Sequence, residues 1–335
     1  MFRALSRAAA VCFFLAPGLA AAEPINLKLS FFTSDRARIY QQSVKPFVDA
    51  VNSDGRGIVH IEVFFSGAIS GEIGRQPQIV SDGSADLAMI IPGQTPERFY
   101  DTSVLELPGL FHDSREGTRV FTRLIGDGAF AGYQDLFVVS AIVSGAESIH
   151  SRKRIDSLAD LNGLRIRVNN RTEAQALQKF GSLPVLLSIN QTTEAISSGT
   201  IDGATIPPLM LSEFGVGRVA THHFMMGLGG AAVALVMNRQ KLESLPPDAQ
   251  SIIRKYSGDW SSSRTADFND AADREALDSL VSDPRRAVVF PDAADAGAIE
   301  AVYRRMTEDY AGISEHNRGL LARVRGELAK LSAGE

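Results

Sequence analysis

Hydrophobic residues recur along the first third of the chain in short runs that alternate with segments of helical periodicity. Alternating or continuous apolar runs predict strands at 25–32, 58–66 and 85–91. Between them, Val44, Phe47, Val48 and Val51 fall on one face of a helix, and a second helix passes through residues 78 and 79. The resulting order of strand, helix, strand, helix and strand is typical of an α/β sheet with helices on its faces.

A second block with the same rhythm follows from residue 157 to residue 208. It predicts a capped turn at Ser157 and then three strands and two helices, at 164–168, 172–180, 184–187, 191–198 and 200–204. Short connections of this kind favour a parallel sheet. In open parallel sheets, ligands bind beyond the carboxyl ends of the strands, and Arg167 stands at such an end. This arginine is therefore a candidate ligand anchor.

The remaining pattern completes two lobes of an α/β protein. Further strands are predicted at 136–145, 232–237 and 287–290. Helices are predicted at 114–125, over much of 246–280, and at 295–310 and 314–331. We assign residues 23–143 and about 233–270 to a first lobe, and about 144–232 and 271–335 to a second. The chain would cross between the lobes more than once, and a cleft between lobes is a common place for a small ligand.

The N-terminal segment is predicted to be a secretory signal peptide. Arg3 and Arg7 precede an apolar stretch, and the small residues Ala20 to Ala22 offer a cleavage site after Ala22. The only cysteine, Cys12, lies inside this segment, so the mature chain is expected to have no disulfide. Cleavage would leave 32 basic and 39 acidic residues, a net charge of −7. We expect a soluble protein outside the cytoplasm.

Several classes of function have no support in the sequence. No basic run indicates nucleic-acid binding, and no later segment is long and apolar enough for a transmembrane helix. The six histidines lack zinc-type spacing, and the G-x-S-x-G, H-E-x-x-H, P-loop and G-x-G-x-x-G motifs are absent. We therefore expect no metal, no cofactor and no catalysis, although a Ser/His/Asp triad assembled from distant residues stays open.

Five short segments carry a resemblance to a known family. LADLNGLRIRV (158–168), FGSLPVLLS (180–188) and EAISSGTIDGA (194–204) follow ELPGLFHD (106–113) and GSADLAM (83–89). In this order they resemble the extracytoplasmic solute-binding proteins of TRAP (tripartite ATP-independent periplasmic) transporters, the DctP-type family. The resemblance extends over essentially all of the mature chain.

The resemblance implies a two-lobed fold like that of periplasmic binding proteins, with a long helix spanning both lobes. Such a receptor captures a small organic anion in the periplasm by closing its lobes, and delivers it to the small and large permease subunits. We also expect a monomer without a cofactor. Arg167 matches the family arginine that pairs with the ligand carboxylate, a role for which a planar guanidinium is suited.

The departures from the family pattern point to a different ligand from a C4-dicarboxylate. Glu147 stands where a base is common, Gln191 replaces an acid, and Ile206 replaces an amide. We infer a monocarboxylate that is larger, more apolar, or carries an amine or hydroxyl group near Glu147. A surface position for Glu147 is the competing interpretation.

Other candidate ligand contacts are positional, and each has a structural alternative. Phe32 and Met210 could form an apolar wall or belong to the core, and Asn169 could donate to the ligand or cap the next helix. The remaining candidates lie at predicted strand ends or in loops beside the cleft: Glu72, Thr33, Gln94 and Pro207.

Two other functions remain compatible with this sequence. The receptor of an ATP-driven importer would share the cleft, and a secreted hydrolase would share the export signal. Turnover of ester or amide substrates would favour the hydrolase.

Overall fold

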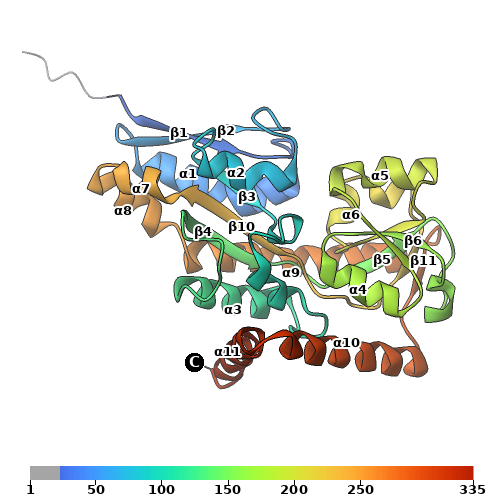
Figure 1. The fold of residues 1–335 in the computed structure, drawn as a ribbon. Helices are drawn as coiled ribbons and strands as arrows, with labels where there is room; N and C mark the ends of the chain where they lie inside the picture. Colours follow the sequence, from blue (N-terminus) through green and yellow to red (C-terminus); the bar gives the residue numbers. More distant parts are fainter. Residues whose placement is uncertain (1–22, 335) are drawn as a thin grey trace, which may run out of the picture.

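A computed structural model describes residues 23–334, which form two lobes connected by several crossings of the chain (Figure 1). The predicted signal peptide, residues 1–22, lies outside the described residues. Each lobe contains its own sheet with helices packed around it. Within the part of the chain that the structure describes, no helix is both long and apolar enough to cross a membrane.

The first lobe is built on a five-stranded mixed sheet. Its strands, in the order in which they pair, are β2 (Val59–Phe64), β1 (Ile25–Ser30), β3 (Leu87–Ile90), β10 (Ala232–Asn238) and β4 (Leu136–Val143). β1 pairs in parallel with β2 and β3, whereas β10 runs antiparallel to β3 and β4. Helices surround the sheet: α1 (Lys45–Asp54), α2 (Gln76–Ser81), α3 (Ser114–Gly126), α7 (Arg239–Ser244) and α8 (Pro247–Lys255).

Two of these helices show how the sequence pattern becomes packing. α1 buries Phe47, Val48 and Val51, the face that the apolar periodicity predicts. α3 begins at Asp113, whose side chain accepts the N–H of Glu116 and so satisfies a donor at the helix N-terminus.

The second lobe contains a six-stranded mixed sheet. The strands are, in pairing order, β11 (Ala287–Val289), β9 (His222–Phe224), β5 (Ser148–Ser151), β8 (Gly203–Ile206), β6 (Arg165–Val168) and β7 (Leu183–Leu186). Its short helices are α4 (Arg171–Lys179), α5 (Ile189–Ser198) and α6 (Met210–Glu213). The predicted turn at Ser157 is present, with a reciprocal cap between Ser157 and Asp160.

The parallel pairing predicted for residues 157–208 is confirmed, because β6 runs parallel to both β7 and β8. β1 likewise runs parallel to β2 and β3. β10 in the first lobe and β5 in the second were not part of that prediction and run antiparallel to their neighbours. The pattern also missed β5 and β9, since SIHS and HHF are short and carry polar residues. β8 begins at Gly203 rather than near residue 200, as residues 200–202 form the turn before it.

The polar residues of β5 and β9 are buried as a hydrogen-bonded histidine pair. The Nδ1 atoms of His150 and His223 lie 2.7 Å apart, and Nε2 of His150 is 3.1 Å from the carbonyl oxygen of Ile206. Burial lowers the pKa of His150 to about 3 and that of His223 to about 4. Both rings are therefore neutral in the fold.

A long helix and two chain segments join the lobes. The chain crosses at residues 144–147 and again at 225–231. α9 (Asp259–Ser282) packs on α3 and β4 in the first lobe and on β11 in the second. Asp270 accepts the N–H of Ser114, and Asp273 accepts the N–H of Leu209 at 2.9 Å. The predicted two-lobed fold with a helix spanning both lobes is thus confirmed.

The last two helices also link the lobes. α10 (Ala293–Ile313) packs against α4, whereas α11 (Glu315–Ser332) packs against α3 in the first lobe. Leu320, Leu321 and Val324 of α11 are buried in the first lobe's core. We therefore propose that residues 315–332 belong to the first lobe, in place of the second lobe to which the sequence pattern assigned them.

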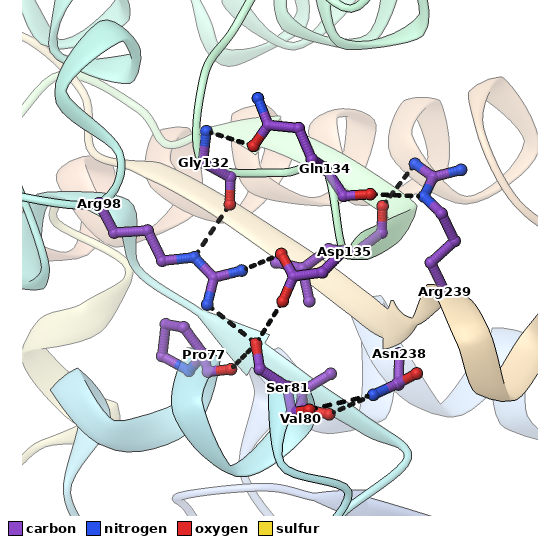
Figure 2. Close-up of polar contacts among 10 residues, drawn as sticks. Pro77, Val80, Ser81, Arg98, Gly132, Gln134, Asp135, Asn238 and Arg239 are labelled. Carbon is purple, nitrogen blue, oxygen red and sulfur yellow. Dashed lines mark hydrogen bonds and ion pairs between the residues drawn. The ribbon is translucent and has the colours of Figure 1, made fainter.

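Arg98 connects three residues of the first lobe by hydrogen bonds and an ion pair (Figure 2). Its Nε donates to the carbonyl oxygen of Gly132 at 2.9 Å, and its Nη1 donates to the hydroxyl of Ser81 at 2.9 Å. Its Nη2 pairs with Asp135. One side chain thus ties α2 to the loop before β4.

Gly132 is required where this loop passes Arg98, because its φ is +91° and a Cβ would overlap the carbonyl oxygen of Arg98. Gly132→Ala should lower the free energy of unfolding by about 2 kcal/mol or more, from backbone strain and from the clash. Gly128→Ala is the matched control, since its φ is +66° but nothing lies within 4 Å of the added Cβ. Urea denaturation should show a larger loss for Gly132→Ala; equal losses would contradict the steric argument.

Candidate functional site

Arg167 is a fully buried guanidinium in the second lobe. It lies on β6, between β7 and β8, and is only 1% exposed. Its Nε donates to the carbonyl oxygen of Leu187 (2.8 Å), its Nη1 to that of Thr205 (3.0 Å) and its Nη2 to Oδ1 of Asn169 (3.2 Å). A guanidinium has five N–H donors, so two have no hydrogen bond within the described contacts. The fork is therefore rigidly held but not saturated.

Glu173 supplies the negative charge next to this guanidinium. It lies in the first turn of α4, where Asn170 caps the helix by accepting its N–H. Its carboxylate accepts from the backbone N–H of Asn169 (2.9 Å), the amide of Asn170 (2.8 Å) and the hydroxyl of Thr205. Burial raises the pKa of Glu173 above its ordinary value, although the charge of Arg167 and the hydrogen bonds from Asn169, Thr205 and Glu147 oppose this rise. An acid that accepts three hydrogen bonds is the ionised member of its group.

Glu147 lies in the first crossing segment and contacts the same carboxylate. It is 2% exposed, its carboxyl is hydrogen-bonded to that of Glu173, and its Oε2 has no partner. Burial and the charge of Glu173 raise its pKa well above the ordinary value. Two carboxylates in contact cannot both be ionised, so Glu147 is protonated and donates to Glu173. The alternative of a surface position for Glu147 was wrong.

Glu106 completes the group from the first lobe. It ends the 3₁₀ helix Tyr100–Glu106, is 3% exposed, and leaves its Oε1 without a partner. Burial raises the pKa of Glu106 to about 8, Glu173 adds to the rise, and the backbone N–H of Ala232 lowers it. Gly93 makes room for it, since a Cβ there would lie 2.8 Å from Oε1. We call Glu106, Glu147 and Glu173 the carboxyl cluster.

An apolar wall crosses between the lobes near the start of α5. Phe31, Phe32, Tyr40 and Phe65 form an aromatic group beyond β1 and β2, with the stacked rings of Phe31 and Phe32 5.4 Å apart. Three side chains of the second lobe pack against both this core and their own: Ile189, Met210 and Phe214. Leu187, whose carbonyl oxygen binds Arg167, lies two residues before Ile189. The wall therefore ends close to the guanidinium.

A separate cavity of about 680 Å³ also lies between the lobes. Its walls come from the first lobe, from α4 and from α10, and include Gly93, Tyr100, Glu106 and Asn170. Arg167 does not line it. The carboxyl cluster thus touches two possible ligand positions, one beside Arg167 and one in this cavity.

The structure brings together some of the predicted site residues and not others. Gln94 bonds across the lobes, its amide donating to the carbonyl oxygen and to Oδ1 (3.2 Å) of Asn169. Asn169 thus holds Arg167, while Asn170 is the residue that caps α4. Phe32 and Met210 join the wall, Thr33 lines a hollow beside it, and Pro207 is buried.

Glu72 and Gln191 are not brought to this group. Both are exposed, Glu72 in the loop before α2 and Gln191 on α5, and no contact joins either to Arg167. Sequence reasoning missed Glu106 and Glu173. For Glu173 a signal existed, because an asparagine followed three residues later by a glutamate is a capping pattern. No group of three or more metal-ligating side chains occurs in residues 23–334.

The raised pKa of Glu106 predicts a pH-dependent stability. Its carboxyl is protonated in the fold below about pH 8, whereas in the unfolded chain it ionises near 4.5. Between these values the unfolded state binds fewer protons, so stability falls as pH rises, by up to about 1.4 kcal/mol per pH unit. Glu106→Gln should remove this slope and become relatively more stable from pH 5 to pH 8.

Urea denaturation at four pH values between 5 and 8 measures the difference. The exposed Glu62→Gln on β2 is the control and should run parallel to the parent protein. Parallel curves for Glu106→Gln as well would show that Glu106 ionises alike in both states.

The fold and the site define a two-lobed solute receptor. The chain belongs to the bacterial extracellular solute-binding proteins of family 7, whose DctP model matches residues 30–312. Proteins of this family are receptors and not enzymes, and the family implies a periplasmic location. The alternatives of a secreted hydrolase and of an ATP-driven importer's receptor are therefore wrong.

Individual relatives are distant in sequence but close in fold. A solute-binding protein of Verminephrobacter eiseniae (strain EF01-2) is 22% identical over 216 residues, 63% of this chain and 64% of the relative. A marine-metagenome TRAP solute-binding protein specific for aromatic acids, solved with 3-hydroxybenzoate, has a TM-score of 0.86 at 21% identity, covering 92% of this chain and 99% of its own. The Rhodoferax ferrireducens T118 TRAP solute-binding protein, solved with copurified benzoate, has a TM-score of 0.83 at 25% identity, with the same coverage.

Other solved relatives hold other acids. A Sulfitobacter sp. NAS-14.1 TRAP solute-binding protein with β-D-galacturonate has a TM-score of 0.78 at 17% identity, covering 90% of this chain and 99% of its own. The fold alone thus accommodates both aromatic and sugar acids.

Proposed function

We propose that this chain is the periplasmic receptor of a TRAP transporter for an apolar, aromatic monocarboxylate. It closes its lobes on the ligand and delivers it to the membrane subunits as a monomer. The observation that carries the proposal is Arg167, a buried guanidinium with two unused N–H donors at the end of the apolar wall. Two parallel N–H groups match one carboxylate.

The charge balance favours a single carboxylate. Glu173 already compensates Arg167, and two further acids, Glu147 and Glu106, are buried beside it. A dianion would bring two negative charges to this group and find no second cation, which is unfavourable in a low-dielectric site. The binding of 3-hydroxybenzoate and benzoate by two similar proteins supports the same ligand class.

The protonation of Glu147 supports a different action on the ligand from the one expected of an ionised acid. As a protonated acid it presents no full negative charge, so it does not call for an amine on the ligand. An apolar body against the wall is therefore the better match.

A thermal-shift screen of organic acids tests the function itself. Benzoate, 3-hydroxybenzoate and mandelate should stabilise the protein, by about 2.7 kcal/mol at a ligand concentration one hundred times Kd, and succinate should not. Stabilisation by C4-dicarboxylates alone would overturn the proposed ligand class.

Arg167→Lys tests the anchor without removing its charge. Arg167→Ala would be a poorer test, because an uncompensated Glu173 would cost stability as well. Lysine keeps the positive charge but cannot make two parallel bonds, so benzoate affinity should fall at least about tenfold. Arg165→Lys on the exposed face of the same strand is the control and should bind as the parent does.

Calorimetric titration of both variants gives the answer. Equal affinity of the Arg167 and Arg165 variants would show that Arg167 is not the anchor.

A pair of substitutions distinguishes the two possible ligand positions. If benzoate lies beside Arg167, Met210→Ala should weaken binding about tenfold, since it removes buried apolar contact. Tyr100→Ala alters the 680 Å³ cavity at a half-exposed position and should leave the affinity unchanged. The reverse outcome would place the ligand in the cavity.

A further inference from the structure

The carboxyl cluster contains more acids than the site has cations. Among residues 23–334, Arg167 is the guanidinium whose charge lowers the pKa values of Glu147 and Glu173. Donor count distinguishes the three acids: Glu173 accepts three hydrogen bonds, whereas Glu147 and Glu106 each leave a buried oxygen without a partner. Below about pH 8 the resting site thus has one cation, one anion and two neutral acids, whereas at pH 8 Glu106 is partly ionised and can gain a proton.

The three acids of the carboxyl cluster come from both lobes and from the segment that joins them. Glu106 comes from the first lobe, Glu147 from the crossing segment and Glu173 from the second lobe. All three side chains are at least 97% buried. Any negative charge added near Arg167 therefore acts on acids that water does not screen.

The negative charge of a bound carboxylate would favour protonation of the carboxyl cluster. It shares Arg167 with Glu173, so the ionised form of Glu173 loses part of its compensation, and the added charge disfavours ionisation of Glu106 and Glu147. Each of these effects draws a proton from solvent onto a carboxyl oxygen. The opposite direction, proton release, would require added positive charge.

We propose that the carboxyl cluster is a proton-binding site, and that the receptor takes up a proton from solvent as it captures a carboxylate at Arg167. The proton forms an O–H bond on the carboxyl of Glu106 or Glu147, whose buried oxygens lack a partner, and the ligand's charge is thereby offset. The inference rests on the proposed function, since it needs a carboxylate at Arg167. The receptor would then bind anion and proton together.

The other titratable groups near the cluster have pKa values well away from pH 8, so a measurement at this pH distinguishes them from the cluster. Burial raises the pKa of Tyr133, which neighbours Glu106, so it is neutral at pH 8. Asp273 of α9 lies against Gly145, and burial raises its pKa only to about 6. His150 on the adjacent β5 is neutral, its pKa being lowered to about 3. At pH 8 the cluster is the group poised to gain a proton.

Calorimetric titration of the full mature protein with benzoate at pH 8 tests the proposal. Benzoate is ionised between pH 7 and pH 9, so it brings no proton of its own. In phosphate and in Tris, whose ionisation enthalpies differ, the measured binding enthalpies should differ by an amount that corresponds to uptake of up to one proton. The Kd should also rise between pH 7 and pH 9, at most about tenfold per pH unit.

Two variants locate the proton, and one serves as a control. Glu106→Gln should still bind benzoate but take up less proton at pH 8; Glu147→Gln replaces it if the first variant fails to fold. Asp273→Asn is the matched control, a half-buried acid outside the cluster whose amide can still accept the N–H of Leu209. It should take up protons as the parent does.

The possible outcomes separate the two proposals. Binding with equal enthalpies in both buffers and a constant Kd would overturn proton uptake and leave the receptor function intact. Undiminished uptake in both glutamine variants would show that neither Glu106 nor Glu147 gains the proton and would also overturn the inference. Failure of every organic acid to bind or stabilise the protein would overturn the proposed function instead.

Discussion

The burial of one arginine is the constraint on which the site depends. A guanidinium that is 1% exposed must keep its charge, so the fold has to supply compensation. It does so from three directions: α4 positions Glu173 through the cap at Asn170, Leu187 after β7 and Thr205 on β8 offer carbonyl oxygens, and Asn169 accepts a third bond. The two N–H donors that remain can form hydrogen bonds to a ligand carboxylate.

The way the lobes are joined fits a protein that opens and closes. Each lobe has its own sheet and its own buried clusters, so separation would disturb the packing at the apolar wall and leave most of each core intact. Across the junction lie a bond from Gln94 to Asn169, an exposed ion pair between Glu97 and Arg171, and the apolar wall at Met210. Exposed ion pairs contribute little free energy, so the pair between Glu97 and Arg171 does little to hold the lobes together. A ligand that adds contacts only in the closed form can therefore shift the equilibrium.

Glu147 illustrates how a correct position can carry a wrong charge. The family pattern placed it beside Arg167, and the structure does bring the two near each other. Read from the sequence, however, it was an anion that repels dicarboxylates or attracts amines. Its contact with Glu173 makes it a neutral acid instead, and the preference for one carboxylate then follows from the whole cluster. A pairwise reading of residues could not reach that result.

The chain's pattern by itself determined the fold class, the family and the location of Arg167 at the end of a strand. These depend on local periodicity, on short motifs and on their order, all of which survive in a single sequence. Only the tertiary structure decided that Glu106, Glu147 and Glu173 meet, because they come from three elements far apart in the chain. It also decided that Glu72 and Gln191 stay at the surface and that β5 and β9 exist. Burial and hydrogen-bond partners set these outcomes, and neither is written in local sequence.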